Sequence, residues 1–175
     1  MNKFAIFTGT VVAAVAAATI LVIRAASPKD APGFFGPGPL VADINLVLEI
    51  LLVLGLTFGF LLARARNIEA HRRNQTLWVL LNAALVACIM VPAMRDVKLE
   101  SLASLADPLY WVTWLHALLG LFTLVAGLWL VLQMNDVLPQ RFHIRGWKNL
   151  MRATLAGYWA VALLGFATYY FWYVG

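Results

Sequence analysis

The chain has 175 residues, of which 63% are hydrophobic and only 12% charged, and its formal net charge is +5. Soluble domains carry about a quarter charged residues, so this composition excludes an ordinary soluble protein and indicates a multi-pass membrane protein. The one cysteine, Cys88, excludes an intramolecular disulfide framework and a cysteine-rich metal site.

Five long apolar runs occupy most of the chain. They cover about residues 4–23, 44–62, 76–94, 109–132 and 150–174. Each approaches or exceeds the ~20 residues that a helix needs to cross ~30 Å of hydrocarbon. A helix is the expected form because it satisfies its own backbone hydrogen bonds in lipid. The sequence therefore predicts an all-α bundle of five transmembrane helices without a soluble domain.

The first run has some features of a signal peptide, with Lys3 before it and small residues after it. Its apolar stretch is longer than the usual 7–15 residues of a signal peptide, and Arg24 closes it. We therefore expect an uncleaved anchor helix over residues 1–24 and a Pro/Gly-rich linker over 25–43. A four-helix membrane core is then expected over 44–175.

Basic residues are unevenly distributed between the two sides of the predicted bundle. One side carries Lys3, Arg64, Arg66, Arg72, Arg73, Arg141, Arg145, Lys148 and Arg152. The other side carries Arg24, Lys29, Arg95 and Lys98, together with Asp30, Asp43, Asp96 and Asp107. The positive-inside rule then predicts an N-terminus inside and a C-terminus outside. The net positive charge is explained by topology, and no nucleic-acid partner is expected.

Two ionisable residues fall inside apolar runs, Glu49 in the second and His116 in the fourth. Both helices enter from the outside, and both residues lie roughly 8–10 Å below the start of their helices at 1.5 Å per residue. We therefore predict that the two side chains lie at a shared depth. They either clamp two helices structurally or form a cofactor or proton-relay site, since intramembrane ionisable residues often mark function.

The fourth run carries small and hydroxyl residues at helical spacing. They are Thr113, His116, Gly120, Thr123 and Gly127, which share one helix face. Such a face is typical of helix–helix contact in membranes, although a groove for a flat cofactor uses the same residues. Packing is the favoured interpretation.

Soft metal ligands occur near the end of the third run. Met90, Met94 and Cys88, joined by His116, are ligand types that select Cu(I). Their spacing matches no copper motif, so we expect the methionines to fill gaps in the core. Copper is the less favoured cofactor.

Two further histidines, His71 and His143, flank the membrane runs on the basic side. Neutral imidazoles in this position are typical axial ligands of haem b. The alternative is a basic interface that contacts anionic lipid. Asn82 is expected to form an interhelical hydrogen bond.

Motifs for hydrolytic or nucleotide chemistry are absent from the sequence. It contains no phosphate-binding glycine loop, nucleophile elbow, zinc motif or paired catalytic carboxylates. An enzyme of these classes is therefore disfavoured.

The order of three histidine contexts resembles a known family. The segments are Leu-Leu-Ala-Arg at 61–64, Ile-Glu-Ala-His-Arg-Arg at 68–73, Trp-Leu-His-Ala-Leu-Leu-Gly at 114–120, and a basic turn with His143. Together they are similar to the CtaM/YozB-like family of small bacterial multi-pass membrane proteins. The resemblance implies a location in the bacterial cytoplasmic membrane and a role in maturation or function of haem–copper oxidases. It supplies no catalytic residues.

Three functional hypotheses follow. The first is an accessory or assembly subunit of a respiratory complex, with a larger membrane complex and lipids as partners. The second is a small redox protein that binds haem b or quinone, with His71 and His143 or His116 and Glu49 as cofactor-binding residues. The third is a purely structural subunit of a larger membrane complex.

Overall fold

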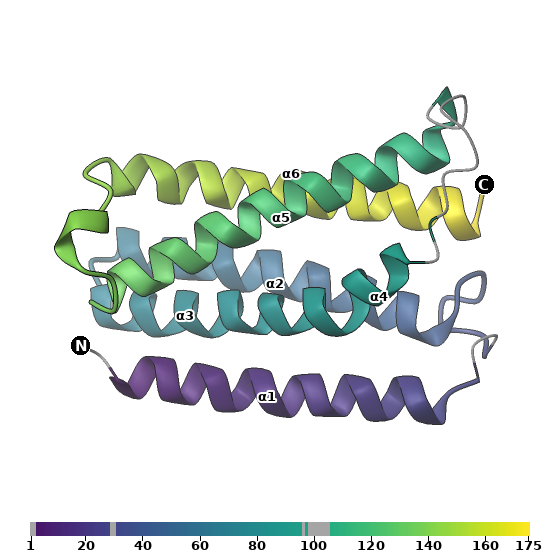
Figure 1. Cartoon of the computed structure of the whole chain (residues 1–175), viewed down its shortest axis with the longest axis horizontal. Coiled ribbons are helices and arrows are strands. Elements are labelled where there is room, and N and C mark those ends of the chain that lie inside the picture. Colours follow the sequence, from purple (N-terminus) through teal and green to yellow (C-terminus); the bar gives the residue numbers. More distant parts are fainter. Residues whose placement is uncertain (1–2, 29–30, 96, 98–105) are drawn as a thin grey trace.

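The computed structural model describes residues 3–28, 31–95, 97 and 106–175. Five segments of the described chain are helices long and apolar enough to cross a membrane, which confirms the predicted fold class. The N- and C-termini lie at opposite ends of the bundle (Figure 1), as an odd number of crossings requires. The elements are α1 Lys3–Ala26, α2 Leu40–Arg64, α3 Ile68–Leu85, a π-helical turn Val86–Met90, α4 Val91–Met94, α5 Pro108–Met134, a 3-10 turn Gln140–Phe142 and α6 Trp147–Tyr173.

Four of the long helices form the core, and the first stands beside it. α2, α3, α5 and α6 pack in a ring, in which α3 contacts α2 and α5, and α6 contacts the same two helices. α1 packs along α3 on the outside of this ring (Figure 1). The core of the ring is a cluster of buried apolar side chains: Leu52, Val53, Leu56, Val79, Val131, Tyr158 and Ala162.

Two helices begin earlier than their apolar runs. α3 starts at Ile68, because the Asn67 side chain caps it by accepting a hydrogen bond from Ala70 N at 3.2 Å. Its polar first turns therefore belong to the helix, and the turn after α2 is short. α2 starts at Leu40, so Asp43 is a helical residue rather than part of the linker.

The short turns after α2 and α5 lie at one end of the bundle, which we call the basic end. Arg66 and Asp136 each follow a helix with a positive φ, of 61° and 55°. In both turns, two backbone N–H groups that follow the helix donate to carbonyls of its last turn, for example Asn67 N to Leu62 O at 3.0 Å. The sequence predicts that this end faces the cytoplasm. Lys29, Asp30, Asp96 and Lys98, which that prediction also uses, lie outside the described residues.

The linker at the opposite end, which we call the linker end, is folded back onto α2. Gly33 N donates to Gly38 O at 2.8 Å, and Leu40 N donates to Ala31 O at 3.2 Å. The turn between them places Phe35 N 2.7 Å from Oδ2 of Asp43, a fully buried carboxylate. Sequence composition indicates an irregular linker, but these contacts give it a defined path.

Arg24, in the last turn of α1, binds the third span close to Pro92. Pro92 has no N–H, so it cannot donate to the carbonyl of Cys88, four residues before it. The adjacent π-helical turn Val86–Met90 distorts the same segment. The Arg24 guanidinium donates a hydrogen bond to Cys88 O. Arg24 therefore satisfies a carbonyl that the helix itself leaves open, and it fastens α1 to the core.

Replacing Arg24 with alanine is expected to lower the free energy of unfolding by about 1–3 kcal/mol, since the Cys88 carbonyl then loses its donor. Thermal unfolding in detergent measures the change. The Pro92→Ala background is the control, because an alanine N–H can take over the bond. An equal loss on Arg24→Ala in both backgrounds contradicts this role of Arg24.

Candidate functional site

A cavity of about 650 Å³ opens at the basic end, between α2, α3, α5 and α6. Its volume lies within the about 300–1,000 Å³ that is typical of ligand and cofactor sites. The wall toward the core is apolar and includes Leu56, Val79 and Tyr158. The basic residues of its lining are Arg64, Arg72, Lys148 and Arg152, together with His71 and His143.

His71 lies in the first turns of α3, and its imidazole is 4% exposed. Its Nδ1 lies 2.7 Å from the carbonyl oxygen of Gly59 in α2. A carbonyl can only accept, so Nδ1 carries the proton and a neutral ring presents a lone pair on Nε2. That Nε2 atom is buried and has no hydrogen-bond partner. The fold therefore holds a fixed, unused imidazole nitrogen in the wall of the cavity.

His143, after the 3-10 turn, also lines the cavity. Its Nε2 lies 3.0 Å from Leu138 O and therefore donates to that carbonyl. The lone pair of this imidazole is then on Nδ1. The structure thus brings both predicted histidines of the basic side to one cavity, but only His71 presents its Nε2 as a free acceptor.

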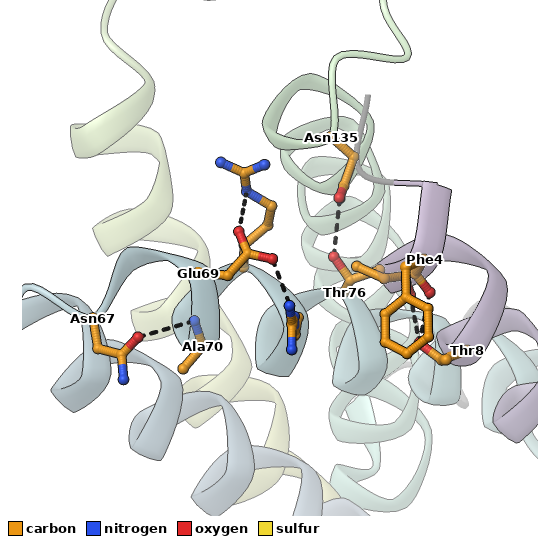
Figure 2. A network of polar contacts seen from close by, with 10 residues as sticks. Phe4, Thr8, Asn67, Glu69, Ala70, Thr76 and Asn135 are labelled. Carbon is orange, nitrogen blue, oxygen red and sulfur yellow. Dashed lines mark hydrogen bonds and ion pairs between the residues drawn. The ribbon is translucent and has the colours of Figure 1, made fainter.

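Two further cavity-lining groups are buried without hydrogen-bond partners, Nε of Arg72 and Oγ1 of Thr154. Glu69 is the acid next to Arg72, with its Oε2 at 3.9 Å from Arg72 Nε. Its Oε1 accepts from Arg73 Nε at 3.0 Å, and Figure 2 shows Glu69 between two guanidinium groups. Sequence patterns do not identify Arg72 or Thr154 as lining a cavity, because the cavity forms only once the helices pack together.

The wall of the cavity is held together by a polar contact between α3 and the end of α5. Asn135, fully buried, caps α5 and donates from Nδ2 to Thr76 Oγ1 at 2.9 Å (Figure 2). The same amide donates to Val131 O at 2.8 Å. Asn82, as predicted, forms an interhelical hydrogen bond, to the hydroxyl of Tyr158 at 3.3 Å.

Glu49 and His116 meet in the other half of the bundle. Oε1 of Glu49 lies 4.0 Å from Nε2 of His116, so the predicted shared depth is confirmed. The distance is too long for a hydrogen bond. His116 Nδ1 lies 3.0 Å from Val161 O, and Gly165 makes room for the Glu49 carboxyl, since a Cβ there would lie 2.4 Å from Oε2.

Buried oxygens without hydrogen-bond partners lie on the two helices that contact His116, α2 and α6. Glu49 is 5% exposed, and its Oε1 has no hydrogen-bond partner. Asn45, one turn earlier on the same face of α2, has a buried Oδ1 without a hydrogen-bond partner. The Oγ1 atom of Thr168 on α6 is also buried without such a partner. The Glu49 carboxyl is therefore not compensated by hydrogen bonds within the described chain.

Glu49→Gln is expected to leave the free energy of unfolding unchanged or to raise it by about 1–2 kcal/mol. A neutral amide of the same shape avoids burying an uncompensated carboxylate. Thermal unfolding in detergent measures the effect. His116→Ala is the comparison, and it is expected to lower the stability because it loses the hydrogen bond to Val161 and side-chain packing. A loss of more than about 1 kcal/mol for Glu49→Gln contradicts this account and indicates a net favourable ion pair.

The small-residue face of α5 is a packing surface against α6, as favoured from sequence. Thr123 lies against Gly157, where an added Cβ would be 2.9 Å from Oγ1, and Thr113 Oγ1 accepts from Trp172 Nε1 at 2.9 Å. Gly127 leaves room for the Tyr158 hydroxyl, which a Cβ would approach to 2.7 Å.

The candidate copper ligands do not form a recognisable centre. Cys88 packs beside Ile20 and Leu85 on the side of α3 that faces α1, whereas His116 contacts α2 and α6. Among the described residues, no three His, Cys, Asp or Glu side chains gather closely enough to hold a metal ion. The cavity with His71 is therefore the candidate site with the most complete geometry. No family model, curated protein or solved structure matches the chain.

Proposed function

We propose that this protein is a haem b-binding accessory or assembly subunit of a respiratory complex of the haem–copper oxidase type. The observation that carries the haem part is the buried Nε2 of His71, which lacks a hydrogen-bond partner in the wall of a cavity of about 650 Å³. Imidazole nitrogens are the usual axial ligands of haem b iron. Its Nδ1 bond to Gly59 O is the kind of outer contact that fixes the tautomer of a metal-ligating histidine.

The other residues of the cavity fit the same group. Haem combines an apolar macrocycle with two carboxylates, and the cavity combines an apolar inner wall with Arg64, Arg72, Lys148 and Arg152. Bound haem supplies one-electron transfer. His71 would hold the iron, and the basic side chains would offset the carboxylates. His143 Nδ1 remains available as a hydrogen-bond acceptor at the edge.

The respiratory part of the proposal is supported by the resemblance to the CtaM/YozB-like family, which rests on the contexts of His71, His116 and His143. The long apolar helices also suit a subunit that works beside larger membrane partners. The expected setting is the bacterial cytoplasmic membrane.

A reduced-minus-oxidised optical spectrum of the protein purified in mild detergent tests the haem part. We expect a Soret shift, directly or after addition of haemin, together with co-purification of a larger haem-containing complex. Absence of the shift under both conditions overturns haem binding. Recovery only as an isolated monomer overturns the accessory role.

A quinol is the second candidate for the same cavity. Nε2 of His71 can accept a hydroxyl proton, while Arg72 Nε and Thr154 Oγ1 offer donors for a carbonyl. Quinone recovered by solvent extraction, without a Soret band, supports this candidate. If neither ligand is found and His116→Ala lowers only the thermal stability, the purely structural hypothesis is favoured.

A further inference from the structure

We propose that the cavity recognises the carboxylates of its ligand, and that it therefore selects a tetrapyrrole as the free diacid. This inference rests on the proposed haem function, and it names what the same cavity recognises in addition to the iron. The structural basis is the excess of basic over acidic side chains in the lining, together with the buried Arg72 Nε, which has no hydrogen-bond partner.

The cavity lining contains four cationic side chains and one acid. Arg64 ends α2, Arg72 lies in the first turns of α3, and Lys148 and Arg152 lie in the first turns of α6. The acid is Asp136, in the turn after α5. Three helices thus bring positive charge to the lining of one cavity, and the excess of positive charge attracts an anionic ligand.

Arg72 is the basic residue best placed to bind a carboxylate. Its Nε is buried and has no hydrogen-bond partner. The adjacent Glu69 stands 3.9 Å from that Nε and accepts a 3.0 Å hydrogen bond from Arg73 instead (Figure 2). Glu69 therefore forms only a long ion pair with Arg72, and Arg72 Nε is left without a hydrogen bond.

A buried donor without an acceptor is costly, and a carboxylate from the ligand removes that cost through a charge-assisted hydrogen bond to Arg72 Nε. The Thr154 hydroxyl, buried and unpartnered in the same lining, adds a neutral donor. The part of the lining that belongs to the buried core cluster, Leu56, Val79 and Tyr158, is apolar. A ligand with carboxylates on one edge and hydrocarbon on the other matches this polarity, whereas a neutral quinone provides no compensating charge.

The test is a titration of the full-length protein, in neutral detergent, with haemin and with haemin dimethyl ester. The ester retains iron for His71 but has no carboxylate charge. We expect the ester to bind at least about tenfold more weakly, as loss of one charge-assisted hydrogen bond implies. In the Arg72→Gln/Arg152→Gln variant the preference for haemin over its ester is expected to fall, because only Arg64 and Lys148 remain as basic side chains of the lining with a full charge. Arg66→Gln/Arg145→Gln is the matched control, because these exposed arginines lie at the same end and do not line the cavity.

Equal binding of haemin and its ester to the unchanged protein overturns the inference and leaves haem binding standing. A second titration uses metal-free protoporphyrin IX and its dimethyl ester, and binding is measured by quenching of tryptophan fluorescence. It tests for recognition of the carboxylates in the absence of iron. If the metal-free diacid binds more tightly than its ester while haemin gives no Soret shift that depends on His71, the result supports carboxylate recognition and contradicts the proposed haem function. If neither porphyrin pair shows a preference, the inference fails.

Discussion

Replacing His71 with alanine is expected to abolish the Soret shift on haemin addition, whereas His143→Ala is expected to retain it. His71 presents a buried, unpartnered Nε2 to the cavity, while the Nε2 of His143 is engaged by Leu138 O at 3.0 Å. Loss of the axial nitrogen removes the coordinate bond, which packing around the macrocycle does not replace. Optical titration of both variants in detergent measures the difference.

Imidazole added to His71→Ala is the control for folding, because a free imidazole can enter the space of the lost side chain and restore the spectrum. Loss of the shift in His143→Ala, or its retention in His71→Ala, contradicts the assignment of His71 as the iron ligand. The His71→Ala variant also loses the 2.7 Å bond to Gly59 O, so its apparent melting temperature is expected to fall in the absence of ligand as well.

Hydrophobic runs are sufficient to predict the five helices. Long apolar segments in lipid have one stable backbone form, so the number of crossings follows from the length of the runs. The ends of α2 and α3 were harder to predict. Hydropathy marks where a helix leaves hydrocarbon, whereas the cap at Asn67 and the start at Leu40 are set by backbone hydrogen bonds.

The depth of Glu49 and His116 could also be predicted, because both helices start on the same side and rise per residue is constant. Their separation of 4.0 Å could not be predicted, because it requires that α2 places Glu49 and α5 places His116 toward α6. A shared depth only permits contact. The choice of helix face and neighbours decides whether contact occurs.

Sequence patterns do not predict the structural role of Asp43, the most buried acid among the described residues. Composition assigns it to the linker, although it lies in α2 and none of its side chain is exposed. Its partners are Phe35, eight residues earlier, and Tyr169, in the last helix. The only local signal is the glycine at position 33, where a Cβ would lie 2.1 Å from Asp43 Oδ2. That signal can be interpreted only once the fold is known.

Asp43→Ala is expected to lower the free energy of unfolding by about 2–4 kcal/mol, because it removes the buried carboxylate that accepts two charge-assisted hydrogen bonds. Phe35 N donates to Oδ2 at 2.7 Å, and the Tyr169 hydroxyl donates to Oδ1 at 2.5 Å. The carboxylate therefore joins the linker, α2 and α6 at the linker end. Thermal unfolding by circular dichroism and titration with a denaturing detergent both measure the loss.

Asp43→Asn and Tyr169→Phe separate the contributions of the two bonds. The amide can still accept from Phe35 N and donate to the Tyr169 oxygen, so Asp43→Asn is expected to cost only about 1–2 kcal/mol. Tyr169→Phe removes one bond but leaves the carboxylate bonded to the linker, so its cost is expected to be similar. A change below about 0.5 kcal/mol for Asp43→Ala would show that the linker is not fastened through this carboxylate. Linker cleavage by added protease should then proceed at the same rate in the variant and the unchanged protein, whereas fastening through Asp43 requires faster cleavage in the variant.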